Sequence, residues 1–208
     1  MILALVGILV IVAVVAVVMV ILDGNDTQPH SSGRIIEPEE RRYGRHGEEI
    51  ATDAIIEYLR EDDALYTNVP VSYGEQRSEL DNVIVNRYGV FIIEVKNYKG
   101  RLYGDEDDYE WQKCKDDANG NTHRMMVKNP IKQVRRQTYI LHKYLESYGV
   151  DVWVQGYALL IHGNSPVESP YILSNVGEID IAIHTRGKNG LDSGTVGKIK
   201  ELLSAGDG

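Results

Sequence analysis

The chain has 208 residues, of which 43% are apolar and 25% are charged, and its formal net charge at pH 7 is −9. This length allows one domain of ordinary size with a substantial core, and the composition excludes collagen-like, disulfide-dense and wholly disordered chains. The single cysteine, Cys114, cannot form an internal disulfide, and the acidic balance argues against a protein that coats nucleic acid through bulk charge.

The first 22 residues contain no charged side chain and are almost entirely apolar. About 20 such residues are enough for a helix to cross the hydrocarbon core of a membrane. A cleaved signal peptide is the alternative, but it normally has a basic start and a cleavage site of small residues, and neither is present. Residues 1–22 are therefore predicted to form a transmembrane anchor, with a secreted protein that has lost its signal as the open alternative.

Basic residues flank the apolar run only on its C-terminal side, at Arg34, Arg41 and Arg42. Since basic flanks stay in the cytoplasm, the rest of the chain is predicted to face the cytoplasm at the cell membrane. Residues 23–42 are rich in Gly, Ser, Asn and charge, which is typical of a flexible linker. A domain with mixed helices and strands is predicted over residues 43–205.

Residues 47–62 have the apolar spacing of a helix. The predicted buried face comprises Ile50, Ala51, Ala54, Ile55, Tyr58 and Leu59. Glu48 projects into this face, where a desolvated carboxylate needs a partner. The alternative role for Glu48 is that of an ordinary first-turn carboxylate favoured by the helix dipole.

Two short runs rich in β-branched residues, 81–86 and 90–96, are separated by Arg87-Tyr88-Gly89. This spacing predicts a β-hairpin. Side chains alternate along a strand, so Glu94 and Lys96 are expected on one face. The second run is apolar on both faces, as in a buried central strand. A charged pair at its end is costly unless the two residues contact each other or serve a site.

Further strands are predicted at residues 100–103, 109–113 and 123–128. Asn129 and Pro130 then provide a helix cap and a first helical residue, and this helix is expected to run to about Tyr148. Gln133 and Gln137 lie one turn apart at the edge of its apolar stripe. Their amides have two possible roles, as structural hydrogen-bonding groups or as groups that reach a site. Two late strands are predicted at residues 152–161 and 179–184, and a closing helix at 195–203.

The order of these features resembles the PD-(D/E)XK nuclease superfamily and, within it, the nuclease-related domain (NERD) family. The resemblance covers about residues 44–160, and Leu80 stands where the superfamily name has proline. The residues that carry it are Gly44, Gly47 and Glu48, the run 79–85 with Asp81, the run 89–97 with Glu94, Lys96 and Asn97, then Gly100, Trp111, Asn129, Pro130 and Gln133.

The resemblance implies a restriction-endonuclease-like fold, in which a mixed sheet is flanked by helices. It implies that Asp81 and Glu94, with Glu48, hold a metal ion, that Lys96 orients or activates water, and that Gln133 assists. Phosphodiester hydrolysis adds negative charge to an anionic phosphate, and Mg²⁺ or Mn²⁺ on carboxylate ligands offsets it. The implied activity is that of a metal-dependent nuclease, which the predicted anchor would hold at the membrane, with DNA as the expected substrate and RNA as the open alternative.

Nucleic acid would have to be bound by local basic groups, for which Arg45, Lys132, Arg135 and Arg136 are the candidates. Such contacts position a phosphate backbone without reading its sequence. The alternative for these residues is a solvated helix face. The alternative for the whole domain is a NERD-like binding or scaffold module at the membrane that does no chemistry.

Overall fold

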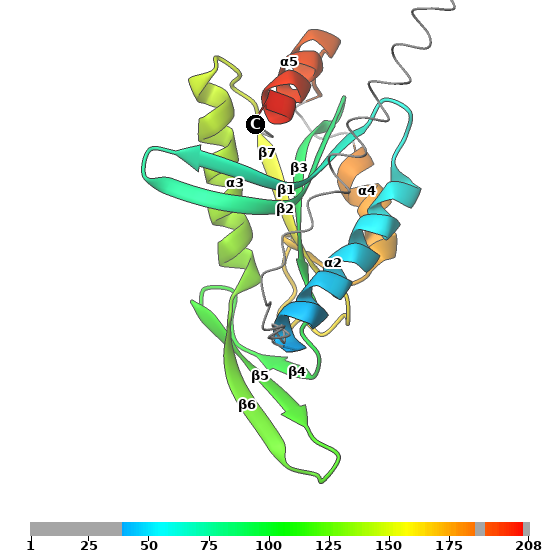
Figure 1. Cartoon of the computed structure of the whole chain (residues 1–208), viewed down its shortest axis with the longest axis vertical. Helices are drawn as coiled ribbons and strands as arrows, with labels where there is room; N and C mark the ends of the chain where they lie inside the picture. Colours follow the sequence, from blue (N-terminus) through cyan, green and yellow to red (C-terminus); the bar gives the residue numbers. More distant parts are fainter. Residues whose placement is uncertain (1–38, 186–189, 206–208) are drawn as a thin grey trace, which may run out of the picture. The chain divides into compact units, whose positions relative to one another are not determined.

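The apolar strand runs form a five-stranded mixed sheet in the computed structural model, which describes residues 39–185 and 190–205 but not the side chains of residues 39–46 and 48. The first three strands pair antiparallel, and the last three pair parallel. In sheet order the strands are β1 (Ala64–Tyr73), β2 (Gln76–Asn86), β3 (Gly89–Lys96), β7 (Val154–Leu160) and β8 (Ile172–Leu173) (Figure 1).

The predicted hairpin is confirmed, because β2 and β3 pair from Asn86↔Gly89 to Asn82↔Ile93. Strand β3 lies at the centre of the sheet, and all of its residues except Lys96 are buried. Its side chains are apolar on both faces up to Glu94, which is the pattern of a strand covered on both sides.

Helices cover both faces of this sheet. On one face, α3 (Pro130–Ser147) and α5 (Ser193–Ser204) share a core cluster with β2 and β3 that includes Ile92, Leu141 and Leu203. On the other face, α2 (Glu39–Tyr58) and α4 (Ile179–His184), which follows the 3-10 turn η1 (Val176–Glu178), share a cluster with Ile93 and Leu159. The predicted mixed α/β class is confirmed.

A second, three-stranded antiparallel sheet lies between β3 and α3 in the chain. It consists of β4 (Arg101–Tyr103), β5 (Glu110–Asp116) and β6 (Thr122–Lys128), close to the predicted strand ranges. Figure 1 shows that the β5–β6 hairpin projects away from the five-stranded sheet.

The structure corrects several predicted elements. Helix α2 begins at Glu39, inside the predicted linker, and ends at Tyr58, and Ile50 is exposed rather than buried. Residues 179–184, predicted as a strand, form helix α4. Helical spacing buries Ile179 and Ile183 there and leaves Ile181 70% exposed. Strands β1 and β8 were not predicted. In β1 the alternation is interrupted by Pro70, which is tolerated because β1 is an edge strand.

The predicted cap of α3 is confirmed. The Asn129 side chain accepts a hydrogen bond from the backbone N–H of Ile131 at 2.9 Å, and Pro130 is the first helical residue. The Asn129 amide also donates to the carbonyl oxygens of residues 105, 106 and 108. Asn129 therefore connects the start of α3 to the loop between β4 and β5.

A close contact between α3 and β7 depends on Gly156. A Cβ atom at this position would lie 2.4 Å from Val134 Cγ1 and 2.6 Å from Thr138 Cγ2. We expect Gly156→Ala to lower the free energy of unfolding by about 1–3 kcal/mol through overpacking, measured by chemical denaturation. Gly197→Ala in α5 is the control. A Cβ there meets nothing within 4 Å, so this change should stabilise the protein by up to about 1 kcal/mol. Losses of equal size in both variants would contradict the expectation.

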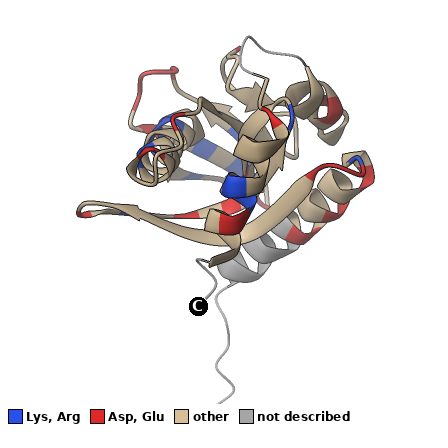
Figure 2. Ribbon diagram, turned by 90° about the horizontal axis from the view of Figure 1, so that it is seen from above, with Lys and Arg blue, Asp and Glu red and all other residues tan. Residues whose placement is uncertain are grey.

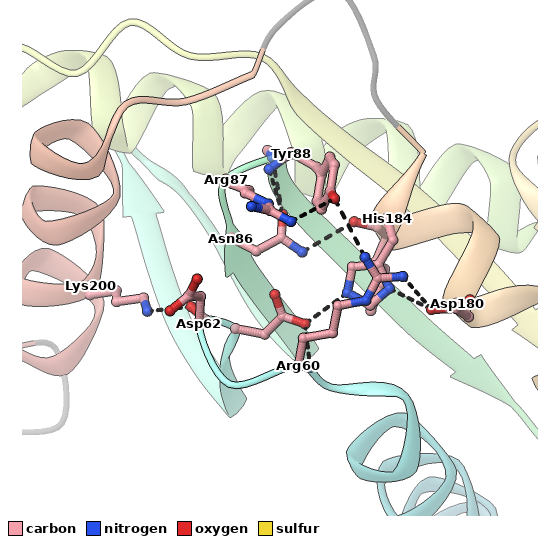
Figure 3. Close-up of polar contacts among 11 residues, drawn as sticks. Arg60, Asp62, Asn86, Arg87, Tyr88, Asp180, His184 and Lys200 are labelled. Atoms are coloured by element: carbon pink, nitrogen blue, oxygen red, sulfur yellow. Dashed lines mark hydrogen bonds and ion pairs between the residues drawn. The ribbon is translucent and has the colours of Figure 1, made fainter.

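A polar network joins α4, the turn between α2 and β1, and the turn between β2 and β3 (Figure 3). His184 Nε2 lies 2.7 Å from Asp63 Oδ2, and His184 Nδ1 lies 2.6 Å from Asp180 Oδ1. Both ring nitrogens of His184 thus face carboxylate oxygens. The Asn86 amide donates to the Ile183 carbonyl oxygen at 3.1 Å. The network therefore connects α4 to the turn between α2 and β1 and to the β2–β3 turn.

No helix within the described ranges is long and apolar enough to cross a membrane. The predicted anchor at residues 1–22 lies outside those ranges and stays a prediction.

Candidate functional site

Glu94 and Lys96 lie in direct contact at the end of β3. Lys96 Nζ donates to Glu94 Oε1 at 2.5 Å, and the two side chains are 16% and 2% exposed. Burial is the largest single influence and lowers the pKa of Lys96, but the charge and hydrogen bond of Glu94, together with the charges of Tyr98 and Asp81, outweigh it and raise the pKa above its ordinary value. The end of the central strand thus holds a protonated amine against a buried carboxylate.

Two glutamines of α3 complete the hydrogen bonds of Glu94. The amide nitrogen of Gln133 donates to Glu94 Oε1 at 2.5 Å, and that of Gln137 donates to Oε2 at 2.6 Å. Gln137 is fully buried, and its Oε1 has no hydrogen-bond partner among the described residues. Gln133 was a predicted site residue, and Gln137 was not. Its position one helical turn after Gln133 was the signal that pointed to it.

Asp81 lies where the pairing of β2 with β3 ends and its pairing with β1 skips one residue. Pairing with β3 stops at Asn82, and Asp81 Oδ2 accepts instead from the backbone N–H of Val95 at 2.8 Å. Pairing with β1 skips Asn68, the residue opposite Asp81 in the register. Asn68 has φ 53°, a left-handed conformation that asparagine tolerates better than most residues. The two interruptions place the Asp81 carboxylate beside β3, close enough to Lys96 to contribute to its raised pKa.

Helix α2 approaches the site closely at Gly47. A Cβ atom there would lie 2.7 Å from Asn97 Cβ, one residue after Lys96. Only glycine allows α2 to pass this close, which accounts for Gly47 in the predicted motif. Glu48 follows Gly47 in α2, but its side chain lies outside the described part of the structure, and its assignment stays a prediction.

A cleft of about 440 Å³ opens between α2 and the first two strands. Its lining includes the carboxylates of Glu49, Asp53 and Asp81, with Thr52 and Asn82 between them. Acidic residues also occur in the last turn of α2 and in the turn that follows it (Figure 2). An anionic cleft of this kind attracts cations and disfavours a phosphate that arrives without one. Glu49 was not among the predicted site residues.

The oxygen donors of the site fit a divalent cation in kind. Mg²⁺ is commonly held by one or two carboxylates and keeps several waters, and Asp81 and Glu94 supply two carboxylates on neighbouring strands. Oε2 of Glu94 accepts one hydrogen bond, from Gln137, and a carboxylate oxygen can accept a second. Among residues 39–185 and 190–205, excluding the undescribed side chains, no group of three or more His, Cys, Asp or Glu residues is arranged to hold a metal ion.

The predicted nucleic-acid-binding residues of α3 contact different partners. Arg135 pairs with Glu106 and lies 4.6 Å above the Tyr171 ring, whereas Arg136 donates to the carbonyl oxygen of Arg77 at 2.9 Å. Lys132 Nζ lies 4.9 Å from the centre of the Tyr109 ring. The side chain of Arg45 is not described. Lys132, Arg135 and Arg136 follow one another at helical spacing along α3, and the role of the four residues in binding stays a prediction.

Comparison with known families gives one match. A family model described as nuclease-related domain matches residues 43–161, more than half of the chain. This segment contains Asp81, Glu94, Lys96, Gln133 and Gln137. Comparisons with curated proteins and with solved structures gave no match.

Proposed function

The chain belongs to the nuclease-related domain family and contains a PD-(D/E)XK-like nuclease domain, and from this membership we propose that it hydrolyses phosphodiester bonds of nucleic acid. The observation that carries the proposal is the Glu94–Lys96 pair, buried at the end of a central strand with Asp81 beside it. The mixed sheet with helices on both faces supports a restriction-endonuclease-like arrangement around this pair.

We propose that Asp81 and Glu94, with Glu48, hold Mg²⁺ or Mn²⁺. When bound, the cation polarises the phosphoryl oxygen and lowers the pKa of a coordinated water. Lys96 has three N–H donors, one of which bonds to Glu94 in the described part of the structure. Its remaining donors serve to orient the attacking water and to stabilise negative charge that develops on the phosphate. Gln133 and Gln137 hold Glu94 in one orientation.

The test is a nuclease assay of the full-length chain with added Mg²⁺ or Mn²⁺. We expect Lys96→Ala and Asp81→Asn to lower the rate on the order of 10³-fold, because each removes a group that acts on the transition state. Lys143→Ala is the matched control. Lys143 pairs with Glu146 on the surface of α3, and its loss should leave the rate unchanged. Equal rates in all four proteins would reject the proposal.

We further propose DNA in preference to RNA as the substrate and a location at the cytoplasmic face of the cell membrane. The apolar run of residues 1–22 and the basic residues that follow it support the location. Membrane fractionation of the full-length chain tests it, and competition between matched DNA and RNA strands tests the substrate preference. Recovery of the chain in the soluble fraction, or equal competition by both strands, would contradict these two points.

A binding module without catalysis is the second candidate function. It is favoured by the hydrogen bonds of Glu94, whose two oxygens already accept from Lys96, Gln133 and Gln137. A calorimetric titration with Mn²⁺ separates the two candidate functions. Uptake that Glu94→Gln abolishes supports the nuclease, and absence of uptake supports the binding module.

A further inference from the structure

The three-stranded sheet is buried at one end and exposed along the rest of its length. Residues 101–128, the β4–β6 arm, bury Leu102, Trp111 and Val127 at their base against the start of α3. Val127 is the one buried residue of β6, and farther along the strand Met125 and Met126 are 40% and 53% exposed. Met125 is paired with Lys113 and lies on the face of Trp111, whereas Met126 is paired with Gln112 and lies on the other face.

Both ends of the arm are attached beside the candidate site. Strand β4 begins five residues after Lys96, and β6 ends two residues before the helix that carries Gln133. The Asn164 amide donates to the carbonyl oxygens of Tyr98 and Gly100 at 2.6 and 2.7 Å, which fixes the first attachment. A ligand that lies along the arm is therefore directed toward Glu94 and Lys96.

The strands of the arm are basic within an acidic chain. The strands carry five lysines and arginines against two acidic residues, but the loops add five more acids, so residues 101–128 together have seven acidic and five basic side chains. Both acidic residues of the strands, Glu110 and Asp116, lie on the face opposite Trp111. The face that carries Lys113 and Lys115 therefore has no acidic strand residue, which favours an anionic partner there. A phosphate backbone combines that charge with sugar surfaces that can lie against exposed methionines.

The two faces of the arm differ in how their cations are placed. Trp111, Lys113 and Lys115 alternate along β5 and share one face, and neither lysine pairs with an acidic residue in the described structure. Lys113 Nζ lies 5.8 Å from the centre of the Tyr98 ring, two residues after Lys96. On the other face Arg101 is paired with Asp116 at 3.3 Å. The face with Trp111 is thus the one that continues into the site.

We propose that Lys113 and Lys115 hold the sugar–phosphate backbone of the nucleic acid and guide it along this face of the β4–β6 arm to Lys96. The inference rests on the proposed function, since it assigns the surface that binds the substrate. It places phosphate contacts on the arm in addition to the residues predicted on α3.

The test compares two double variants of the full-length chain that remove the same charge from opposite faces. Lys113→Gln/Lys115→Gln should weaken the binding of a long labelled DNA strand about 10-fold and make its log–log salt dependence shallower by about 1.4, as expected for two lost phosphate contacts. Arg101→Gln/Arg124→Gln should change both quantities much less. These positions share the other face, because both pair with Cys114.

Hydrolysis of bis(p-nitrophenyl) phosphate, which is too small to reach the arm, separates this inference from the proposed function. We expect Lys113→Gln/Lys115→Gln to leave that rate unchanged. Equal weakening of DNA binding by both double variants, or no weakening by either, overturns the inference even if the protein cleaves DNA. Selective weakening by Lys113→Gln/Lys115→Gln in a protein that cleaves nothing supports the arm and rejects the nuclease.

Discussion

Glu94→Gln is expected to lower the nuclease rate on the order of 10³-fold and also to destabilise the fold. The glutamine side chain has the same shape but carries one acceptor oxygen, and its own amide N–H groups would face the donors of Lys96, Gln133 or Gln137. Lys96 would also lose its counter-charge. An uncompensated buried charge costs about 3–5 kcal/mol, and we expect about 2–3 kcal/mol here because the Lys96 side chain is 16% exposed.

A second variant separates the two effects of Glu94. Glu94→Gln/Lys96→Met removes both charges, so it should recover most of the lost free energy of unfolding while the enzyme stays inactive. Chemical denaturation and the nuclease assay measure the two quantities on the same samples. If the double variant were less stable than Glu94→Gln, the pair would stabilise the fold through its charges, and the argument from desolvation would be wrong.

His184→Phe is expected to lower the free energy of unfolding by about 1–3 kcal/mol, because it removes the His184 hydrogen-bond partner of the buried Asp63 carboxylate. The side chains of His184 and Asp63 are each 3% exposed, so water cannot replace the lost partner. Asp63 Oδ2 would keep its bond from the backbone N–H of Arg60 at 2.8 Å, which is too little to compensate a full charge. Thermal and chemical denaturation measure this loss.

Asp180→Asn is the matched control, because Asp180 bonds to the other ring nitrogen of His184 but is 45% exposed. We expect a small loss at neutral pH. The hydrogen bond from His184, more than the charge of Arg60, holds the pKa of Asp180 below its ordinary value of 3.8. The stabilisation from this carboxylate is therefore present above pH 3.8 and is lost as the pH falls below it, and Asp180→Asn should remove that dependence. Equal losses in the two variants would mean that Asp63 is solvated.

The features predicted correctly from the sequence are those that depend on local patterns. Alternation placed Glu94 and Lys96 on one face, the short Arg87-Tyr88-Gly89 turn set the hairpin, and Asn129 with Pro130 marked the start of α3. Each of these depends on residues only a few positions apart, so the amino-acid types alone carry the information.

The features that were missed depend on contacts between distant segments. Ile179, Ile181 and Ile183 alternate as a strand would, and only their surroundings decide that Ile181 is the exposed side of a helix. Likewise, Gln137 donates to Glu94 because α3 packs against the end of β3, and this contact between two separate elements is not visible in the sequence around Gln137. The partnership of Asp63 with His184 spans 121 positions in the chain, and no local pattern predicts it.

The close approach of β7 and α3 at Gly156 is linked to the hydrogen bonds of Glu94 through α3. A Cβ at this position would meet Val134 and Thr138. Each of these residues directly follows one of the two glutamines that donate hydrogen bonds to Glu94. Added bulk on β7 would push that stretch of α3 outward and draw both amides away from the carboxylate together. The volume of the side chain at position 156 would therefore change how firmly α3 holds the Glu94 carboxylate, without the replacement of any polar residue.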